Sequence, residues 1–251
     1  MLACSFGFEH GRAHHSGAQL YFGTDDVSKG QTMHTDQFGL ADDDYIPDAD
    51  SDSAAVVDGF FDYFAAELPD SDGLIAEMRT RLTESEAEDA YRIVDEPAGY
   101  NLRMTLALVV AYRTLRPRLG RDAAIALVRA AFVEPLGDAV AASTRAMLDS
   151  AEDPFAAMVA VSKAREEFAF GAGFTFERPV DHDRGYHLNV VRCFYHEVLV
   201  AHSAPELTPV MCEFDANWIG AIEPRAHGFR FRRTTTIGLG GSHCPFHFDR
   251  T

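Results

Sequence analysis

The side chains best suited to chemistry are concentrated in the last sixty or so residues of this chain. Three of the four cysteines lie there, with the single tryptophan and five of the seven histidines that follow residue 34. Thiols and imidazoles are common nucleophiles, proton carriers and metal ligands. Cysteine is also a frequent core residue, so an inert buried position is the alternative for each one. The concentration predicts a site in the C-terminal quarter.

Four residues of this region form the predicted catalytic set. Cys212 and Asp215 are three residues apart, so a helix would place them on one face. Cys193 falls at an expected junction of strand and helix, and Cys244 follows a glycine-rich turn. At both places a fixed backbone can present a side chain to a ligand. We therefore expect the three cysteines to converge in space.

A second set of residues is predicted to bind substrate. An expected strand carries an arginine and hydroxyl groups beside a glycine turn, a combination suited to a small carboxylate or amide. The glycines allow close approach of the backbone to a ligand, with a plain hairpin turn as the alternative. For the arginines the alternative is a solvated sheet face. The set comprises Arg192, Arg233, Thr234, Thr236, Gly240 and Gly241.

Three cysteines with histidines nearby also raise the question of a zinc site. Structural zinc sites are typically built from closely spaced pairs of ligands. Here Cys193 and His196 form the only such pair among these residues. We therefore expect no metal and no other cofactor, while a metal held by the three cysteines remains the alternative.

Composition limits the partners of this protein. The formal net charge of −17 over 251 residues disfavours nucleic acid and anionic membrane surfaces, because both require basic patches. No apolar run is long enough to span a membrane, and no signal peptide is recognisable. Four widely spaced cysteines do not suggest a disulfide framework. We expect a reduced, cytoplasmic protein that acts on a small molecule.

The chain divides into three parts by composition and periodicity. Residues 1–52 are acidic and aperiodic, which predicts a disordered tail. Residues 53–171 carry helical periodicity, and residues 172–251 alternate as strands do, with short helices between them. The fold class expected is α+β, a single domain over 53–251 in which a helical layer packs on a small antiparallel sheet.

Several boundaries follow from capping residues and prolines. Asp52 or Ser53 is expected to cap the first helix, and the apolar helix from Asn101 is expected to end at Pro117. One helix from Pro205 is expected to carry both Cys212 and Asp215. The strands are expected at 174–180, 186–192, 229–236 and 244–248, with the glycine turn joining the last two.

The C-terminal motifs resemble the L-2-amino-thiazoline-4-carboxylic acid hydrolase family. The resemblance is carried by V-x-R-C at 190–193, P-E-L at 205–207, C-x-x-D at 212–215 and R-T-x-T-I-G-x-G-G-x-x-C-x-F at 233–246. The last motif is fairly specific, because threonine, glycine and cysteine recur in it at fixed spacing. The resemblance covers about the last sixty residues well.

The resemblance implies hydrolysis of a cyclic amidine. Water adds at the carbon between nitrogen and sulfur, and the intermediate loses thiolate to give an N-carbamoyl cysteine. Such a reaction needs a base, donors for the developing charge and a clamp for the carboxylate. The resemblance suggests Asp215 as the base, with direct attack by a Cys244 thiolate as the alternative.

The same resemblance implies roles for the substrate-binding residues, and the chain departs from the family pattern at one place. The resemblance implies that Arg233, with Thr234 or Thr236, holds the carboxylate, and that backbone amides near Gly240 and Gly241 support the developing charge. The family pattern ends in C-D-F-R, whereas residues 244–247 read C-P-F-H. This departure predicts a changed substrate, such as a related biosynthetic intermediate.

A second hypothesis comes from another class of protein. A helical layer followed by a small sheet that ends in Gly-x-x-Cys-x-Phe is also similar to small-molecule-binding domains of the 4-vinyl reductase type. On this interpretation the protein binds a ligand or a metal and catalyses no reaction.

Overall fold

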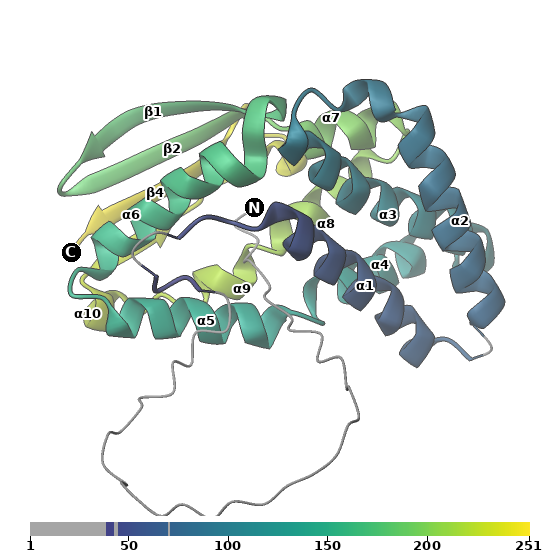
Figure 1. The fold of residues 1–251 in the computed structure, drawn as a ribbon, viewed down its shortest axis with the longest axis horizontal. Helices are drawn as coiled ribbons and strands as arrows, with labels where there is room; N and C mark the ends of the chain where they lie inside the picture. Colours follow the sequence, from purple (N-terminus) through teal and green to yellow (C-terminus); the bar gives the residue numbers. More distant parts are fainter. Residues whose placement is uncertain (1–38, 43–44, 70) are drawn as a thin grey trace, which may run out of the picture.

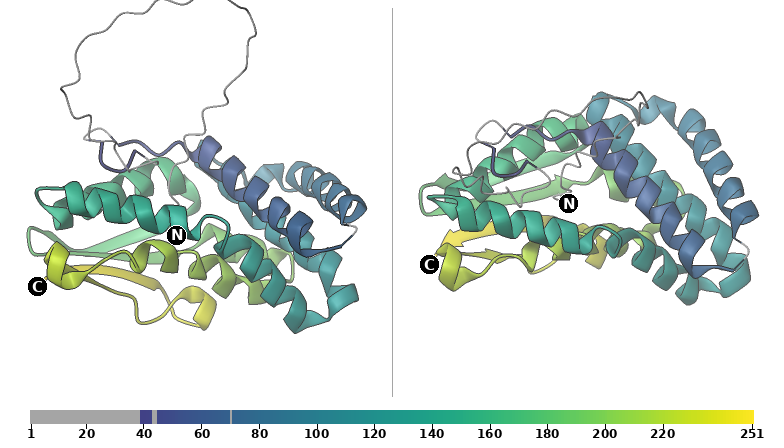
Figure 2. Two further views of the ribbon diagram at one scale, coloured as in Figure 1. Left: turned by 90° about the horizontal axis from the view of Figure 1, so that it is seen from below. Right: turned by 60° about the horizontal axis from the view of Figure 1, so that its bottom comes forward.

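The computed structural model describes residues 39–42, 45–69 and 71–251. Within these ranges a series of helices precedes a four-stranded antiparallel sheet, so the predicted α+β class is confirmed. Figure 1 shows helices α1 to α4 at one end of the molecule and the strands at the other. The two further views in Figure 2 show the same separation.

The helical part consists of six long helices and three short turns. The long helices are α1 (Ala49–Glu67), α2 (Asp72–Glu88), α3 (Glu96–Leu119), α4 (Arg121–Val133), α5 (Gly137–Ser150) and α6 (Pro154–Arg165). The 3-10 turns are η1 (Ala90–Arg92) and η3 (Gly171–Gly173), and between them η2 (Glu166–Phe170) is a π-helical turn that continues α6. Helix α3 contacts α1, α2 and α4 and is the central element.

Helix α3 extends beyond both of its expected ends, which were Asn101 and Pro117. Asp95 caps it by accepting a hydrogen bond from the amide of Ala98 at 2.9 Å, and Pro97 lies in the first turn, where a missing N–H costs nothing. Pro117 lies inside the last turn, and the helix ends only at Gly120, whose φ is 82°. The expectation that Pro117 ends this helix was therefore wrong.

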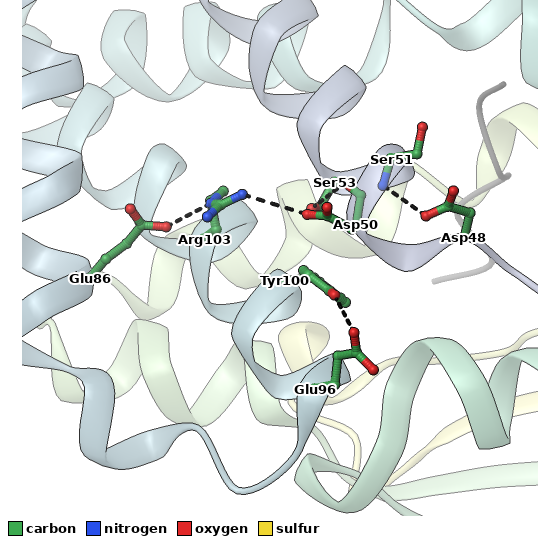
Figure 3. Close-up of polar contacts among 8 residues, drawn as sticks. All are labelled: Asp48, Asp50, Ser51, Ser53, Glu86, Glu96, Tyr100 and Arg103. Atoms are coloured by element: carbon green, nitrogen blue, oxygen red, sulfur yellow. Dashed lines mark hydrogen bonds and ion pairs between the residues drawn. The ribbon is translucent and has the colours of Figure 1, made fainter. Parts of the chain in front are cut away.

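Helix α1 begins earlier than expected, because Asp48 rather than Asp52 or Ser53 caps it. The Asp48 carboxylate accepts from the amide of Ser51 at 3.0 Å. Figure 3 shows this cap beside Arg103 of α3, which donates to Glu86 of α2 at 2.8 Å and lies 4.0 Å from Asp50 of α1. One guanidinium thus links three helices.

The sheet has the strand order β1-β2-β4-β3, with β1 at Thr175–His182, β2 at Gly185–Arg192, β3 at Phe229–Arg232 and β4 at Cys244–Arg250. Side chains alternate between its two faces. Cys244 pairs with Val190, Phe246 with Leu188 and Phe248 with Tyr186, and all six side chains are buried. Helix α6 packs against this inner face, where Phe155 contacts Phe229.

Short helices connect β2 to β3. They are α7 (Phe194–Ala201), η4 (Pro205–Leu207), α8 (Thr208–Glu213), α9 (Ala216–Ile219) and α10 (Pro224–His227). The single helix expected from Pro205 is therefore divided, and Asp215 lies between α8 and α9. Cys212 and Asp215 still lie one turn apart.

The third strand ends at Arg232, four residues before its predicted end. Residues 233–243 leave the sheet and form a loop that contains the 3-10 turn η5 (Ile237–Leu239). Gly238 allows this loop to lie on α8, since a Cβ there would come within 2.9 Å of the Thr208 side chain and 3.0 Å of the Pro209 nitrogen. The glycine segment is thus a packed loop and not the expected hairpin turn.

The predicted disordered tail at 1–52 falls largely outside the described residues. Within the described part of that segment, Leu40 is buried and α1 already starts at Ala49. Among the described helices, none combines the length and the apolar character needed to cross a membrane.

Candidate active site

A cavity lies between the inner face of the sheet, the η2–η3 segment and α8. Its walls are mainly apolar, and five phenylalanines contribute to them: Phe170, Phe174, Phe176, Phe246 and Phe248. The polar groups that reach the cavity are few, so each one has a strong influence on which ligand fits.

The three cysteines converge on this cavity, as the sequence predicted. Cys193 precedes α7 at the end of β2, Cys212 lies in α8, and Cys244 is the first residue of β4. All three line the cavity, and the Cys212 and Cys244 thiols are hydrogen-bonded to each other. Three separate elements therefore deliver their sulfur atoms to one place.

The environment gives the three thiols different acidities. The hydrogen bond from Cys244 lowers the pKa of Cys212 to about 6 against the opposing effect of burial, and the Thr236 hydroxyl adds to the lowering. The same hydrogen bond, followed by burial, raises the pKa of Cys244. Burial raises the pKa of Cys193 to about 11. The two thiols therefore form a coupled pair in which Cys212 is the more acidic member, while the Cys244 sulfur also accepts a hydrogen bond from the Ile237 amide at 3.1 Å.

Asp215 also lines the cavity, in a buried ion pair with Arg233. Its Oδ2 accepts from Nη1 of Arg233 at 2.5 Å, and its Oδ1 accepts from Nε1 of Trp218 at 3.0 Å. Arg233 also donates from Nη2 to the carbonyl of Cys212 at 3.0 Å, and its guanidinium lies over Phe246. A proton on Asp215 would break this pair. The arrangement fixes the end of α8 and with it the Cys212 backbone.

The threonines and glycines of the loop do not lie together in the cavity. Thr234 is exposed and Thr236 is buried, and both line a neighbouring groove together with Arg233 and Cys212. The Thr236 hydroxyl is buried without a hydrogen-bond partner among the described residues. The amides of Gly240 and Gly241 donate to the carbonyls of Ile237 and Thr236 within the loop. Those amides are already used by the turn, and their expected role in supporting a developing charge stays a prediction.

Arg192 lies outside the cavity. It forms two hydrogen bonds with Glu197, of 2.8 and 2.7 Å, and its side chain is about half exposed. Arg192 ends β2, and the following turn into α7 directs it to its partner five residues later. Its expected contact with substrate is therefore not seen in this geometry.

A polar cluster that the C-terminal motifs do not predict lies at another part of the cavity. Glu166 opens the π-helical turn η2 and accepts hydrogen bonds from Tyr186 and Arg178. Ser162, one turn earlier, lines the cavity as well. Interruptions of this kind in a helix are frequent at functional sites. The sequence does contain a signal for this cluster. Met158, Ser162 and Glu166 follow one another at the four-residue spacing of a buried helix face.

Asn101 of α3 supports this part of the wall. Its side chain donates to the carbonyl of Ala169 at 2.9 Å and accepts from the hydroxyl of Tyr195 at 2.7 Å. Tyr195 lines the cavity, and burial raises its pKa well above the usual value. The central helix thereby holds both η2 and α7 in place.

No group of three or more His, Cys, Asp or Glu side chains in the described part of the chain is arranged to hold a metal ion. His196, the expected partner of Cys193, shares a hydrogen bond with Thr208 at 3.0 Å.

Comparison with known proteins places the chain in a family. A family model described as L-2-amino-thiazoline-4-carboxylic acid hydrolase matches residues 100–248. The chain belongs to this family of hydrolases. The match begins in α3 and includes every cavity residue named above, so it extends well beyond the C-terminal motifs. No curated protein and no solved structure gave a significant match.

Proposed function

We propose that the protein hydrolyses a small cyclic amidine, such as a 2-amino-thiazoline or a related biosynthetic intermediate, and that Cys212 is the nucleophile. The observation that carries this proposal is the Cys212 sulfur in the cavity wall beside the Cys244 thiol. A thiol whose pKa is lowered is ionised at neutral pH and is a strong nucleophile.

The reaction proceeds in two steps on this proposal. The Cys212 thiolate adds to the carbon between the ring nitrogen and sulfur, and collapse of the adduct breaks the ring C–S bond. The departing sulfur takes the proton of Cys244, which leaves an isothiourea bound to Cys212. Water then attacks the same carbon and returns a proton to Cys244, and loss of Cys212 releases the N-carbamoyl aminothiol.

Asp215 and Arg233 act in this scheme as positioning residues. Their ion pair holds the carbonyl of Cys212 and therefore the end of α8. A second mechanism for the same hydrolysis has water as the nucleophile and Asp215 as the base. It is supported by the place of Asp215 in the cavity wall, where each carboxylate oxygen keeps a second lone pair.

A panel of 2-amino-thiazolines and other cyclic amidines tests the proposal. We expect turnover by the wild-type protein, loss of turnover in Cys212→Ser, and little change in Cys193→Ser, the matched control. Iodoacetamide should inactivate the enzyme by modifying Cys212, and substrate should protect it, as peptide mass spectrometry would show.

The other outcomes separate the alternatives. Full activity in Cys212→Ser, with a loss of about 10²–10⁴ in rate in Asp215→Asn, would support water as the nucleophile. Binding of the panel without any turnover would instead support the non-catalytic binding domain of 4-vinyl reductase type.

A further inference from the structure

The cavity extends along the inner face of the sheet between two polar ends. Cys244 lies opposite Val190 at one end, and Phe248 lies opposite Tyr186 at the other. Four residues along a strand separate these positions, a distance of roughly 13 Å. Phe246 lies between them and also lines the cavity. A ligand that reaches both ends must therefore be elongated.

The end distant from the cysteines carries unused hydrogen-bonding capacity. Ser162 is 3% exposed, and its hydroxyl has no hydrogen-bond partner among the described residues. Glu166 is buried beside it and accepts one bond on each oxygen, from Tyr186 and Arg178, so each oxygen keeps a second lone pair. A buried polar group without a partner is costly, and a ligand donor placed here would satisfy both residues.

Neither end of the cavity offers a free cation. Arg233 is the only arginine or lysine among the described residues that line the cavity, and its terminal nitrogens already bond Asp215 and the carbonyl of Cys212. The guanidinium of Arg178 is paired with Glu166. The charge of each guanidinium is already balanced by a buried carboxylate, so a ligand carboxylate would bring a second negative charge to the same buried site, which is unfavourable.

We propose that this hydrolase takes an elongated cyclic amidine without a carboxylate, whose aromatic body lies along Phe246 and whose far end presents a neutral hydroxyl or amide N–H donor to Glu166 and Ser162. The inference rests on the proposed function, because it places the amidine carbon at Cys212. It also gives a physical reason for the phenylalanine-rich walls, since aromatic rings favour offset and edge-on contacts with one another.

Three matched 2-amino-thiazolines test the inference, each with a phenyl substituent that ends in a para hydroxyl, methyl or carboxylate group. Binding is measured by calorimetry on the full-length Cys212→Ala protein, and turnover is measured on the wild type. We expect the hydroxyl compound to bind about tenfold more tightly than the methyl compound, and the carboxylate compound to bind least.

Variants then assign the preference to its residues. Glu166→Gln and Ser162→Ala should each reduce the preference for hydroxyl over methyl. Glu167→Gln, an exposed neighbour in the same turn, is the control and should behave as the parent. Ser162→Ala also keeps the test informative if Glu166→Gln does not fold.

The outcomes of these measurements distinguish a failure of the inference from a failure of the proposed function. Equal affinities for the hydroxyl and methyl compounds, tightest binding of the carboxylate compound, or binding of none would overturn the inference. A preference that persists in both variants would overturn it as well. If the hydroxyl preference holds and depends on Glu166 but the wild type hydrolyses none of the three, the recognition stands and the hydrolase proposal fails.

Discussion

At the scale of single residues, the cavity distinguishes side chains of the same type by their surroundings. Cys212 and Cys244 share one hydrogen bond, which lowers the pKa of the first and raises that of the second. Cys193 lies in the same wall, but its pKa is raised mainly by burial. Three thiols of one cluster can thus differ in acidity.

The rate of alkylation should identify the ionised thiol. With iodoacetamide at a series of pH values, modification of Cys212 should reach half of its plateau rate near pH 6, whereas Cys193 should need strongly alkaline pH. Peptide mass spectrometry after quenching measures both in one experiment. In Cys244→Ala the midpoint for Cys212 should move upward because its donor is lost. An unchanged midpoint would show that Cys244 does not stabilise the thiolate.

Glu166 should make the stability of the protein depend on pH. Burial raises the pKa of its carboxyl above the usual 4.5, although Tyr186 and Arg178 act in the opposite direction. The folded protein therefore holds the proton more tightly than the unfolded chain. The resulting stabilisation is complete below the unfolded pKa and is lost as the pH rises through the folded pKa.

Urea unfolding of wild type and Glu166→Gln at pH 4, 5.5 and 7 measures this effect. The free energy of unfolding of the variant, relative to wild type, should rise with pH, since glutamine does not ionise. Glu167→Gln, at an exposed position in the same turn, is the control. A difference for Glu166→Gln that falls with pH would contradict the raised pKa.

At the scale of elements, the loop 233–243 and helix α8 act as one unit. The loop packs on α8 through Gly238, and the ion pair of Arg233 with Asp215 ties the start of the loop to the end of the helix. This unit carries Cys212 and Thr236 and ends at Cys244. The alignment of the two reactive thiols therefore depends on the contact between loop and helix.

Removal of one partner from the buried pair should be costly. Arg233→Met leaves the Asp215 carboxylate, 1% exposed, without its counter-charge, and we expect a loss of about 3–5 kcal/mol in the free energy of unfolding. Arg232→Met is the matched control, since its side chain is 53% exposed and surface pairs contribute about 1 kcal/mol or less. Chemical denaturation measures both. Equal losses in the two variants would show that the Arg233 pair is not specially important.

At the scale of the whole molecule, the cavity lies where the sheet meets the helices. The inner face of the sheet supplies the phenylalanines and Cys244, α6 and η2 supply Ser162 and Glu166, and α8 supplies Cys212. Figure 1 shows α6 running alongside β2 and β4. Neither the sheet nor the helices could enclose a ligand alone, so the site requires the complete domain.

The N-terminal boundary of that domain can be tested by truncation. Deletion of residues 1–38, whose composition is aperiodic and polar, should leave the free energy of unfolding nearly unchanged. Deletion of residues 1–48 also removes the buried side chain of Leu40 and the cap from Asp48. The longer deletion should therefore cost about 2–4 kcal/mol. A loss of similar size in the shorter deletion would show that residues 1–38 also stabilise the domain.

Local signals in the sequence were sufficient for the fold class. Helical and strand periodicity depend on neighbours a few residues away, so the order of helices and strands could be predicted. The same holds for the family, since its motifs lie in short segments around Cys193, Cys212 and Cys244. Boundaries were less certain where a proline sat near a helix end, because Pro97 and Pro117 are both compatible with the turns they occupy.

The sequence by itself was enough to predict that the three cysteines of the C-terminal quarter converge, and the structure places all three in one cavity wall. Only the tertiary structure decided that Cys212 carries the lowered pKa, that Arg233 is occupied by Asp215, and that Glu166 faces the cavity from a helix with no such motif. The reason is physical. Acidity and available charge depend on burial and on partners that are distant in sequence, and packing alone brings those partners together.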